Sequence, residues 1–371
     1  MKKPLVQDFP IEHVPAGNSS DTIASTFPRD KQINALTSTR AIAAILVFIH
    51  HFGPGNIFPP FARIGNVAVC YFFVLSGFVL YLSYQGKHVR YSDYLKKRIG
   101  RIVPVYLLAL LITVSLAVVF FGNNLSSARS IKELVLSAFF LQAFVPTYPL
   151  TLNLPGWTIS VEMFFYLLFP LLLTVQRKNI KYFAVMAAVL FIASQYIHLK
   201  YFPIRKTLGD NIVDTVFFSP WIHLSQFLLG MIAGYIFNRI KGIAPKYKFL
   251  PLALFIAIIL FIAYRTYRPE NLSFQVGLLD PLFMLLILSI AINDPKILNI
   301  RPLVYLGEIS YGIYILQWPV YQFLELMNER HMHIPMPYFF SCALIILVLF
   351  ASLSYHLMEL PLKRKISSIK I

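Results

Sequence analysis

A basic side chain and a titratable one lie in the same long apolar segment near the start of the chain. Arg40 is followed by nine apolar residues and then by His50 and His51. On an α-helix, His51 would lie about 16 Å deeper than Arg40 and within about 20° of the same face. A neutral imidazole can accept a proton as a general base. We therefore predict that His51, paired with Arg40, is catalytic, and that His50, about 80° away, is satisfied by a neighbouring helix.

Two arginines precede another apolar segment. Arg98 and Arg101 are three residues apart, so they share a helical face. Guanidinium groups bind phosphate through paired hydrogen bonds. From the spacing alone, phosphate binding and simple anchoring of positive charge at the membrane surface are equally good interpretations. The adjacent Lys96 and Lys97 are interpreted as anchors.

A third group of polar residues begins a further apolar segment. Thr158, Glu162 and Tyr166 recur every four residues and would share one face of a helix. An acid inside a membrane helix needs a partner. The sequence predicts that Glu162 orients or charge-balances His51, with a purely structural ion pair as an equal alternative.

The composition indicates which elements must position these residues. Hydrophobic residues make up 57% of the 371-residue chain and charged residues 13%, whereas soluble domains carry about 25% charged residues. Continuous apolar runs favour membrane-spanning helices over a β-barrel. We predict an all-α, polytopic integral membrane protein with ten spans: 39–59, 62–84, 102–121, 157–176, 182–200, 218–238, 249–267, 273–292, 303–325 and 336–357.

The basic residues indicate how these helices are oriented. The net charge of +17 is concentrated in short loops beside apolar segments, which is typical of the positive-inside rule rather than of nucleic-acid binding. If the apolar stretch 133–148 crossed the membrane, the basic loops after it would change sides. We therefore predict a re-entrant or interfacial helix there, with both chain termini in the cytoplasm.

The chain divides into a membrane domain and two polar ends. Residues 1–36 are expected to form a flexible cytoplasmic tail, without the apolar segment of a cleavable signal peptide. Residues 37–362 form the membrane domain, and 363–371 a basic cytoplasmic tail. Cys70 and Cys342 lie in apolar segments without metal-ligand spacing, so no metal site is predicted.

Together these segments resemble the type-3 membrane acyltransferase family over residues 36–362. The family hallmark, an arginine, ten residues and a histidine in the first span, is matched by Arg40 and His51. Other matching elements follow in the family's order: Gly65 to Phe78 ending in Leu-Ser-Gly-Phe, Arg98 to Tyr106, Trp157 to Tyr166, Leu306 to Tyr311, and Glu359 to Pro361.

The chain departs from the family pattern in two respects. Many members have a histidine at the position of Gln317, so a second titrating group is not expected there. Some members also continue into an extracytoplasmic esterase-like domain, which we do not expect in this protein. We therefore expect the membrane domain to complete the transfer alone or with a separate partner.

The resemblance implies an O-acyltransferase of the bacterial cytoplasmic (inner) membrane. It would transfer an acyl group, most often acetyl, from acyl-CoA on the cytoplasmic side to a hydroxyl of an envelope carbohydrate or similar acceptor. Acyl-CoA is thus a donor substrate, and no bound cofactor is expected.

The resemblance also implies a role for each candidate residue. His51 would deprotonate the acceptor, Arg40 would position the donor or stabilise an oxyanion, and Glu162 would orient His51. Arg98 and Arg101 would hold coenzyme phosphates. The predicted substrate-binding residues are Trp157, Tyr166, Ser310 and Tyr311.

Other functions fit part of the same pattern. A polytopic transporter or flippase of a sugar or lipid-linked sugar would also bury charge in helices broken by proline. A non-catalytic acyl or lipid sensor is a third reading. A covalent acyl-histidine intermediate is an alternative to base catalysis, and neither the acceptor nor the acyl length is specified by the sequence.

Overall fold

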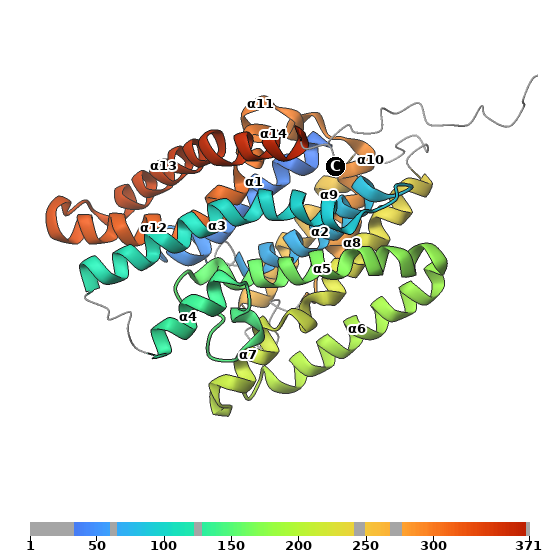
Figure 1. Cartoon of the computed structure of the whole chain (residues 1–371), viewed down its shortest axis with the longest axis horizontal. Coiled ribbons are helices and arrows are strands. Elements are labelled where there is room, and N and C mark those ends of the chain that lie inside the picture. Colours follow the sequence, from blue (N-terminus) through green and yellow to red (C-terminus); the bar gives the residue numbers. More distant parts are fainter. Residues whose placement is uncertain (1–32, 60–64, 122–127, 241–248, 268–276, 369–371) are drawn as a thin grey trace, which may run out of the picture. The chain divides into compact units, whose positions relative to one another are not determined.

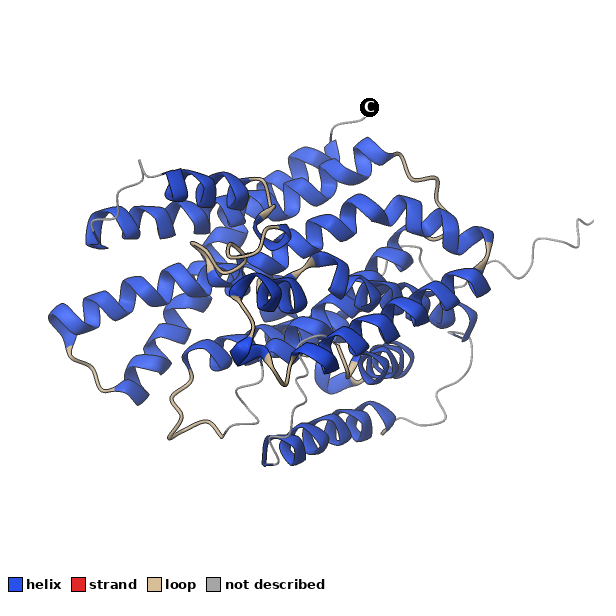
Figure 2. Ribbon diagram, turned by 90° about the horizontal axis from the view of Figure 1, so that it is seen from below, coloured by secondary structure: helices blue, strands red, loops and turns tan. Residues whose placement is uncertain are grey.

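The computed structural model describes residues 33–59, 65–121, 128–240, 249–267 and 277–368. Within these ranges all regular elements are helical (Figures 1 and 2). Helix α1 (Asn34–Phe52) begins three residues before the predicted domain boundary at 37, and the tail expected before it lies outside the described residues apart from 33–36. Helix α14 (Leu360–Ser368) occupies most of the predicted C-terminal tail.

Seven helical segments in the described part of the chain are long and apolar enough to cross a bilayer, which confirms an all-α polytopic membrane protein. Helices α9 (Leu250–Tyr267) and α10 (Asp280–Asn293) are apolar over shorter lengths. The seven segments contain α1, α2 (Gly65–Tyr84), α3 (Tyr91–Phe121), α5 (Trp157–Lys178), α6 (Ile180–Tyr201), α7 (Asp210–Phe218) with α8 (Pro220–Ile240), and α13 (Met336–Ser354).

The single span predicted at 303–325 is two helices. Helix α11 (Arg301–Glu308) ends at Ile309, and α12 (Ser310–Met327) begins immediately after it. A Cβ atom added at Gly307 would overlap the backbone of Thr37, so α11 lies directly against α1. The chain therefore leaves helical geometry between a helix that packs on α1 and the helix that follows it.

At one end of the bundle, Arg177 joins the end of α5 to the turn between α2 and α3. A guanidinium nitrogen of Arg177, at the end of α5, donates to the carbonyl oxygens of Tyr84 at 2.7 Å and Lys87 at 2.9 Å in the turn between α2 and α3. Figure 1 shows the α2–α3 and α5–α6 turns at this same end. We call it the basic end; it is the end at which α1 and α3 begin and α2 and α5 finish.

The segment after α3 returns into the bundle without crossing it. Helix α4 (Ala128–Ala138) has 11 residues, too few to span a bilayer. The chain beyond it contacts buried parts of two long helices: the Gln142 side-chain amide donates to the Tyr106 hydroxyl of α3 at 3.1 Å, and that of Asn153 donates to the Ile315 carbonyl of α12 at 3.1 Å. The prediction that 133–148 does not span is therefore consistent with the structure.

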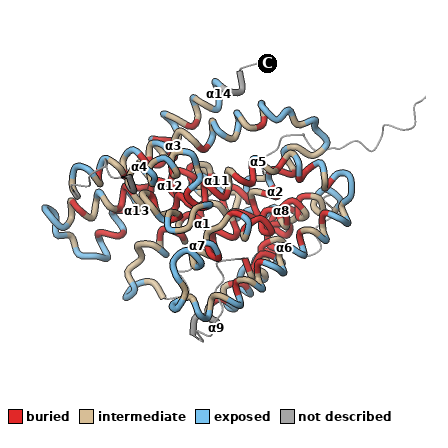
Figure 3. Tube along the Cα trace, turned by 60° about the horizontal axis from the view of Figure 1, so that its bottom comes forward, coloured by how far each residue is buried: buried red, intermediate tan, exposed pale blue. Residues whose placement is uncertain are grey.

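Helices α2 and α8 approach each other more closely than side chains would allow. A Cβ atom at Gly77 would overlap the Phe227 carbonyl oxygen, and one at Gly230 would overlap that of Val74. Small residues permit this close packing between membrane helices. Figure 3 shows buried residues gathered along both helices.

Candidate active site

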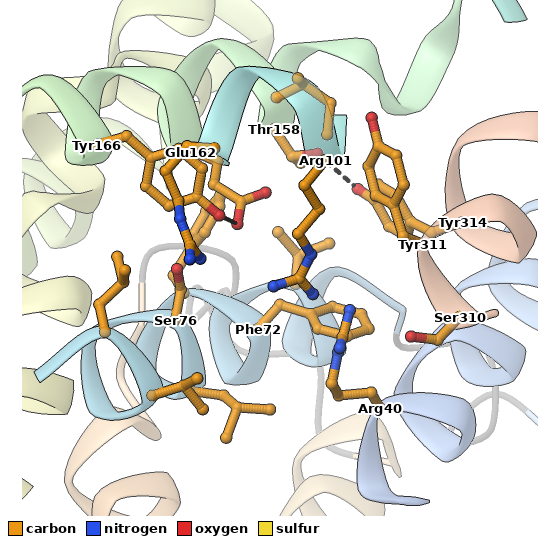
Figure 4. A pocket seen from close by; sticks show the side chains of 17 residues that line it. Arg40, Phe72, Ser76, Arg101, Thr158, Glu162, Tyr166, Ser310, Tyr311 and Tyr314 are labelled. Atoms are coloured by element: carbon orange, nitrogen blue, oxygen red, sulfur yellow. Dashed lines mark hydrogen bonds between the residues drawn. The ribbon is translucent and has the colours of Figure 1, made fainter. Parts of the chain in front are cut away.

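A cavity of about 120 Å³ lies among α1, α2, α3, α5 and α12 (Figure 4). Helix α2 supplies most of its apolar surface, and the other helices supply mainly polar and charged groups. The residues that line it are Arg40, Val69, Phe72, Phe73, Leu75, Ser76, Val79, Leu80, Arg98, Arg101, Thr158, Ile159, Glu162, Tyr166, Ser310, Tyr311 and Tyr314.

Three guanidinium groups face this cavity, and among the described residues Glu162 is the single carboxylate on its lining. Arg40 comes from α1, whereas Arg98 and Arg101 come from one face of α3, one turn apart. Figure 4 shows Arg40 and Arg101 directed toward each other from opposite sides. The guanidinium of Arg98 lies 5.9 Å from the centre of the Tyr166 ring. This excess of positive charge would be neutralised by an anionic ligand, for which guanidinium groups have matching geometry.

The Glu162 carboxylate is hydrogen-bonded to a side chain of its own helix, α5. The Tyr166 hydroxyl, one turn further along α5, donates a short hydrogen bond to its carboxylate. Within the described residues, no ion pair shorter than 4.0 Å joins this carboxylate to an arginine. Both residues and Thr158 line the cavity, so the face predicted from their four-residue spacing does point inward.

His51 is not among the residues that line this cavity. Its Nδ1 atom lies 3.2 Å from Oε1 of Gln317 on α12. The rings of His50 and Phe52 are centred 5.3 Å and 5.8 Å from its own. The partner predicted from the sequence was Glu162; the structure instead places Gln317 beside His51 and Tyr166 beside Glu162.

The cavity and His51 are nevertheless neighbours along α12. Ser310, Tyr311 and Tyr314 line the cavity, and Gln317 lies one turn after Tyr314 on the same helix. The Tyr314 hydroxyl is hydrogen-bonded to Thr158 at 3.0 Å, and its ring meets Phe72 edge-on with centroids 5.8 Å apart. Among the α12 residues that line the cavity, Tyr314 is thus the nearest in sequence to Gln317, which contacts His51.

Two other predicted substrate-binding residues have contacts within the protein: Trp157 packs against aromatic rings, and Tyr311 is hydrogen-bonded to a backbone carbonyl. Trp157 does not line the cavity; it is buried against Phe73, which does, and against His223, with ring centroids 6.1 Å and 5.2 Å away. Tyr311 lines the cavity, and its hydroxyl donates to the Ile102 carbonyl oxygen at 2.7 Å.

Several residues that the structure brings to the cavity or to His51 have no site role predicted from the sequence. Helical spacing alone could have suggested some of them, because Tyr314 and Gln317 lie four and seven residues after Ser310. The others became evident only from the packing of α2 and α5. The residues are Phe72, Ser76, Thr158, Tyr314 and Gln317.

The chain is similar in sequence to several known acyltransferases. The O-acetyltransferase OatA of Staphylococcus aureus is 23% identical over 364 residues, covering 90% of this chain and 58% of the relative. The acyltransferase MdmB of Streptomyces mycarofaciens is 24% identical over 324 residues, 80% of this chain and 81% of the relative. The peptidoglycan O-acetyltransferase OatA of Listeria monocytogenes is 23% identical over 366 residues, 90% and 56% respectively.

This chain therefore spans little more than half the length of the two OatA proteins. No solved structure matches it. A family model described as an acyltransferase domain matches residues 33–356, which include the whole cavity and His51. The chain belongs to the type-3 membrane acyltransferase family.

Proposed function

We propose that this protein is a membrane O-acyltransferase that transfers an acyl group, typically acetyl, from acyl-CoA to a hydroxyl of an envelope carbohydrate or a similar acceptor. The observation that carries this proposal is the contact of His51 with Gln317, which lies one helical turn along α12 from Tyr314 in the lining of a cavity with three arginines. Family membership and the names of the O-acetyltransferase relatives support the reaction type.

The donor enters from the basic end, which we place in the cytoplasm, where acyl-CoA is available. A pocket for a drug-sized ligand measures about 300–1,000 Å³, so the cavity of about 120 Å³ accommodates only the acyl end of the donor. Arg101 is exposed and binds phosphate groups that remain near the cavity mouth. Arg40 and Arg98 complete the positive surface along which the thioester is held.

The chemistry then requires the thioester and the acceptor hydroxyl to meet at His51. The imidazole removes the hydroxyl proton as the oxygen attacks the thioester carbonyl carbon. A carbon–oxygen bond forms, the carbon–sulfur bond breaks, and the coenzyme leaves as a thiol after taking up the proton. Arg40 lines the cavity about three helical turns before His51 on α1, so its role is to position the donor.

The direct test uses membrane vesicles with the basic end accessible, supplied with radiolabelled acetyl-CoA. We expect label to accumulate in the envelope glycan or glycolipid fraction above the level of vesicles lacking the protein. Mass spectrometry of surface glycans from a deletion strain identifies the acceptor as the sugar that loses its acetyl mass. Absence of label transfer, together with uptake of a labelled sugar, would instead support a transporter.

Replacing Arg101 with glutamine is expected to raise KM for acetyl-CoA about 10- to 100-fold with a smaller effect on kcat, because a hydrogen bond to a charged group contributes about 1.5–3 kcal/mol. The matched control is Lys97→Gln, which removes an exposed positive charge from the same helix outside the cavity lining. Initial-rate kinetics with varied donor concentration distinguish them. Equal KM values for the two variants would contradict donor binding by Arg101.

A further inference from the structure

The side-chain amide of Gln317 has one orientation that its surroundings permit. This residue is fully buried on α12, and its Nε2 atom donates to the Tyr314 carbonyl oxygen at 2.6 Å. If the amide were turned by 180°, its Oε1 atom would face that carbonyl oxygen at the same separation, and neither atom carries a proton to share. The carbonyl of Tyr314 therefore requires Nε2 on its own side and directs Oε1 toward His51.

This orientation determines which His51 nitrogen carries the proton. Oε1 of Gln317 can only accept a hydrogen bond, and it lies 3.2 Å from Nδ1 of His51. The proton between them must therefore belong to Nδ1. A neutral imidazole has one proton on its two nitrogens, so Nε2 retains a free lone pair.

The α12 turn that carries Gln317 is itself fixed in place. Pro319 has no backbone N–H, so the Ile315 carbonyl, four residues earlier, loses its partner within the helix. The Asn153 side-chain amide donates to this carbonyl at 3.1 Å, which joins α12 to the segment between α4 and α5. Together with the hydrogen bond between Thr158 and Tyr314, this contact fixes the turn of α12 that immediately precedes Gln317.

We infer that Gln317 is a positioning residue that holds the neutral His51 ring as the Nδ1–H tautomer and so makes Nε2 the atom that accepts the proton. The proton position follows from the geometry alone; its catalytic meaning rests on the proposed function. Among the described groups around this imidazole, His50 on α1 is the titratable neighbour, and α12 contributes the uncharged amide of Gln317.

The inference is tested first by NMR of the full chain in nanodiscs, with ¹⁵N in the histidine rings and His51→Asn to assign the signal. Protonated and bare ring nitrogens have distinct shifts. We expect a protonated Nδ1 and a bare Nε2 in the wild type, and a population with the proton on Nε2 in Gln317→Leu. A proton on Nε2 in the wild type, or identical spectra for the two proteins, would overturn the inference.

The second test uses kinetics. Gln317→Leu is expected to lower kcat about 10-fold, a part of the about 10²- to 10⁴-fold that a positioned base contributes, and to leave KM for acetyl-CoA unchanged. Gln317→Glu keeps an acceptor for Nδ1, although it loses the donor to the Tyr314 carbonyl oxygen, and it restores part of kcat. Because its carboxylate stabilises the imidazolium form, the acidic limb of the pH–activity profile moves to higher pH. An unmoved profile in a folded Gln317→Glu protein would contradict the inference.

The matched control is Gln176→Leu. Gln176 is also a buried glutamine whose side-chain amide donates to a carbonyl oxygen, that of Met231 at 3.0 Å on α8. Its replacement should leave the His51 signals and the shape of the pH profile unchanged. If the NMR result holds and no acyl transfer is detected, the proposed function fails; if transfer occurs with the opposite tautomer, only the role of Gln317 fails.

Discussion

His51→Ala is expected to lower kcat for acyl transfer by about 10²- to 10⁴-fold, the range contributed by a positioned general base. Without the imidazole, the acceptor hydroxyl must attack with its proton still bound or lose it to water. The wild-type rate should also fall as the pH is lowered, because a protonated imidazole cannot accept the proton. Transfer of radiolabelled acetyl groups by purified protein measures both effects.

The control for this prediction is the adjacent histidine. His50 is exposed and lies beside His51, so His50→Ala removes the same chemical group from the same helix and should retain most of the activity. Size-exclusion chromatography establishes that both variants remain folded. Full activity in folded His51→Ala would remove this residue from the mechanism. Labelled protein recovered after incubation with donor alone would indicate a covalent acyl-histidine intermediate instead of base catalysis.

Gly230→Val is expected to prevent stable packing of α2 against α8. The first atom of any side chain at this position would overlap the Val74 carbonyl oxygen and crowd the Phe78 backbone nitrogen. Overpacking typically costs about 1–3 kcal/mol, and here the obstructing atoms belong to the backbone, so the helices must separate. We expect the free energy of unfolding to fall by about 3 kcal/mol or more. Activity should also be lost, because α2 lines the cavity.

Thermal unfolding in detergent, followed by circular dichroism, checks this prediction. The matched control is Gly209→Ala, since a Cβ atom at Gly209 would have no neighbour within 4 Å. That variant should unfold near the wild-type temperature. Equal unfolding temperatures for Gly230→Val and wild type would show that the two helices do not approach as closely as described.

Hydropathy predicts those parts of the fold that depend on local composition. Spans 157–176 and 182–200 correspond closely to α5 and α6, because each apolar run is bounded by charged or polar residues. The break at Ile309 was missed, since it depends on contact between Gly307 and Thr37, more than 250 residues apart in the sequence. Gly307, Glu308 and Ser310 stand at this point, but hydropathy averaged over a whole span does not reveal such a contact.

In the candidate site too, local spacing predicted some features, and others depend on contacts between distant segments. Helical periodicity placed Arg98 with Arg101 on one face and Glu162 with Tyr166 on another, and both faces line the cavity. Periodicity does not specify which faces meet, however. In the structure His51 contacts Gln317 rather than the expected Glu162. The sequence marked Gln317 only as a departure from the family pattern.

The backbone contact between α2 and α8 also determines where the protein can change shape during turnover. Neither helix can slide or tilt without forcing carbonyl oxygens into the space left by Gly77 and Gly230, so the α2 side of the cavity is an immobile half of the bundle. A donor larger than the present cavity must instead displace helices on its other side, such as α3, which contributes Arg98 and Arg101 to the lining. The distance between labels on α2 and α3 should therefore change on substrate entry, and the distance between labels on α2 and α8 should not.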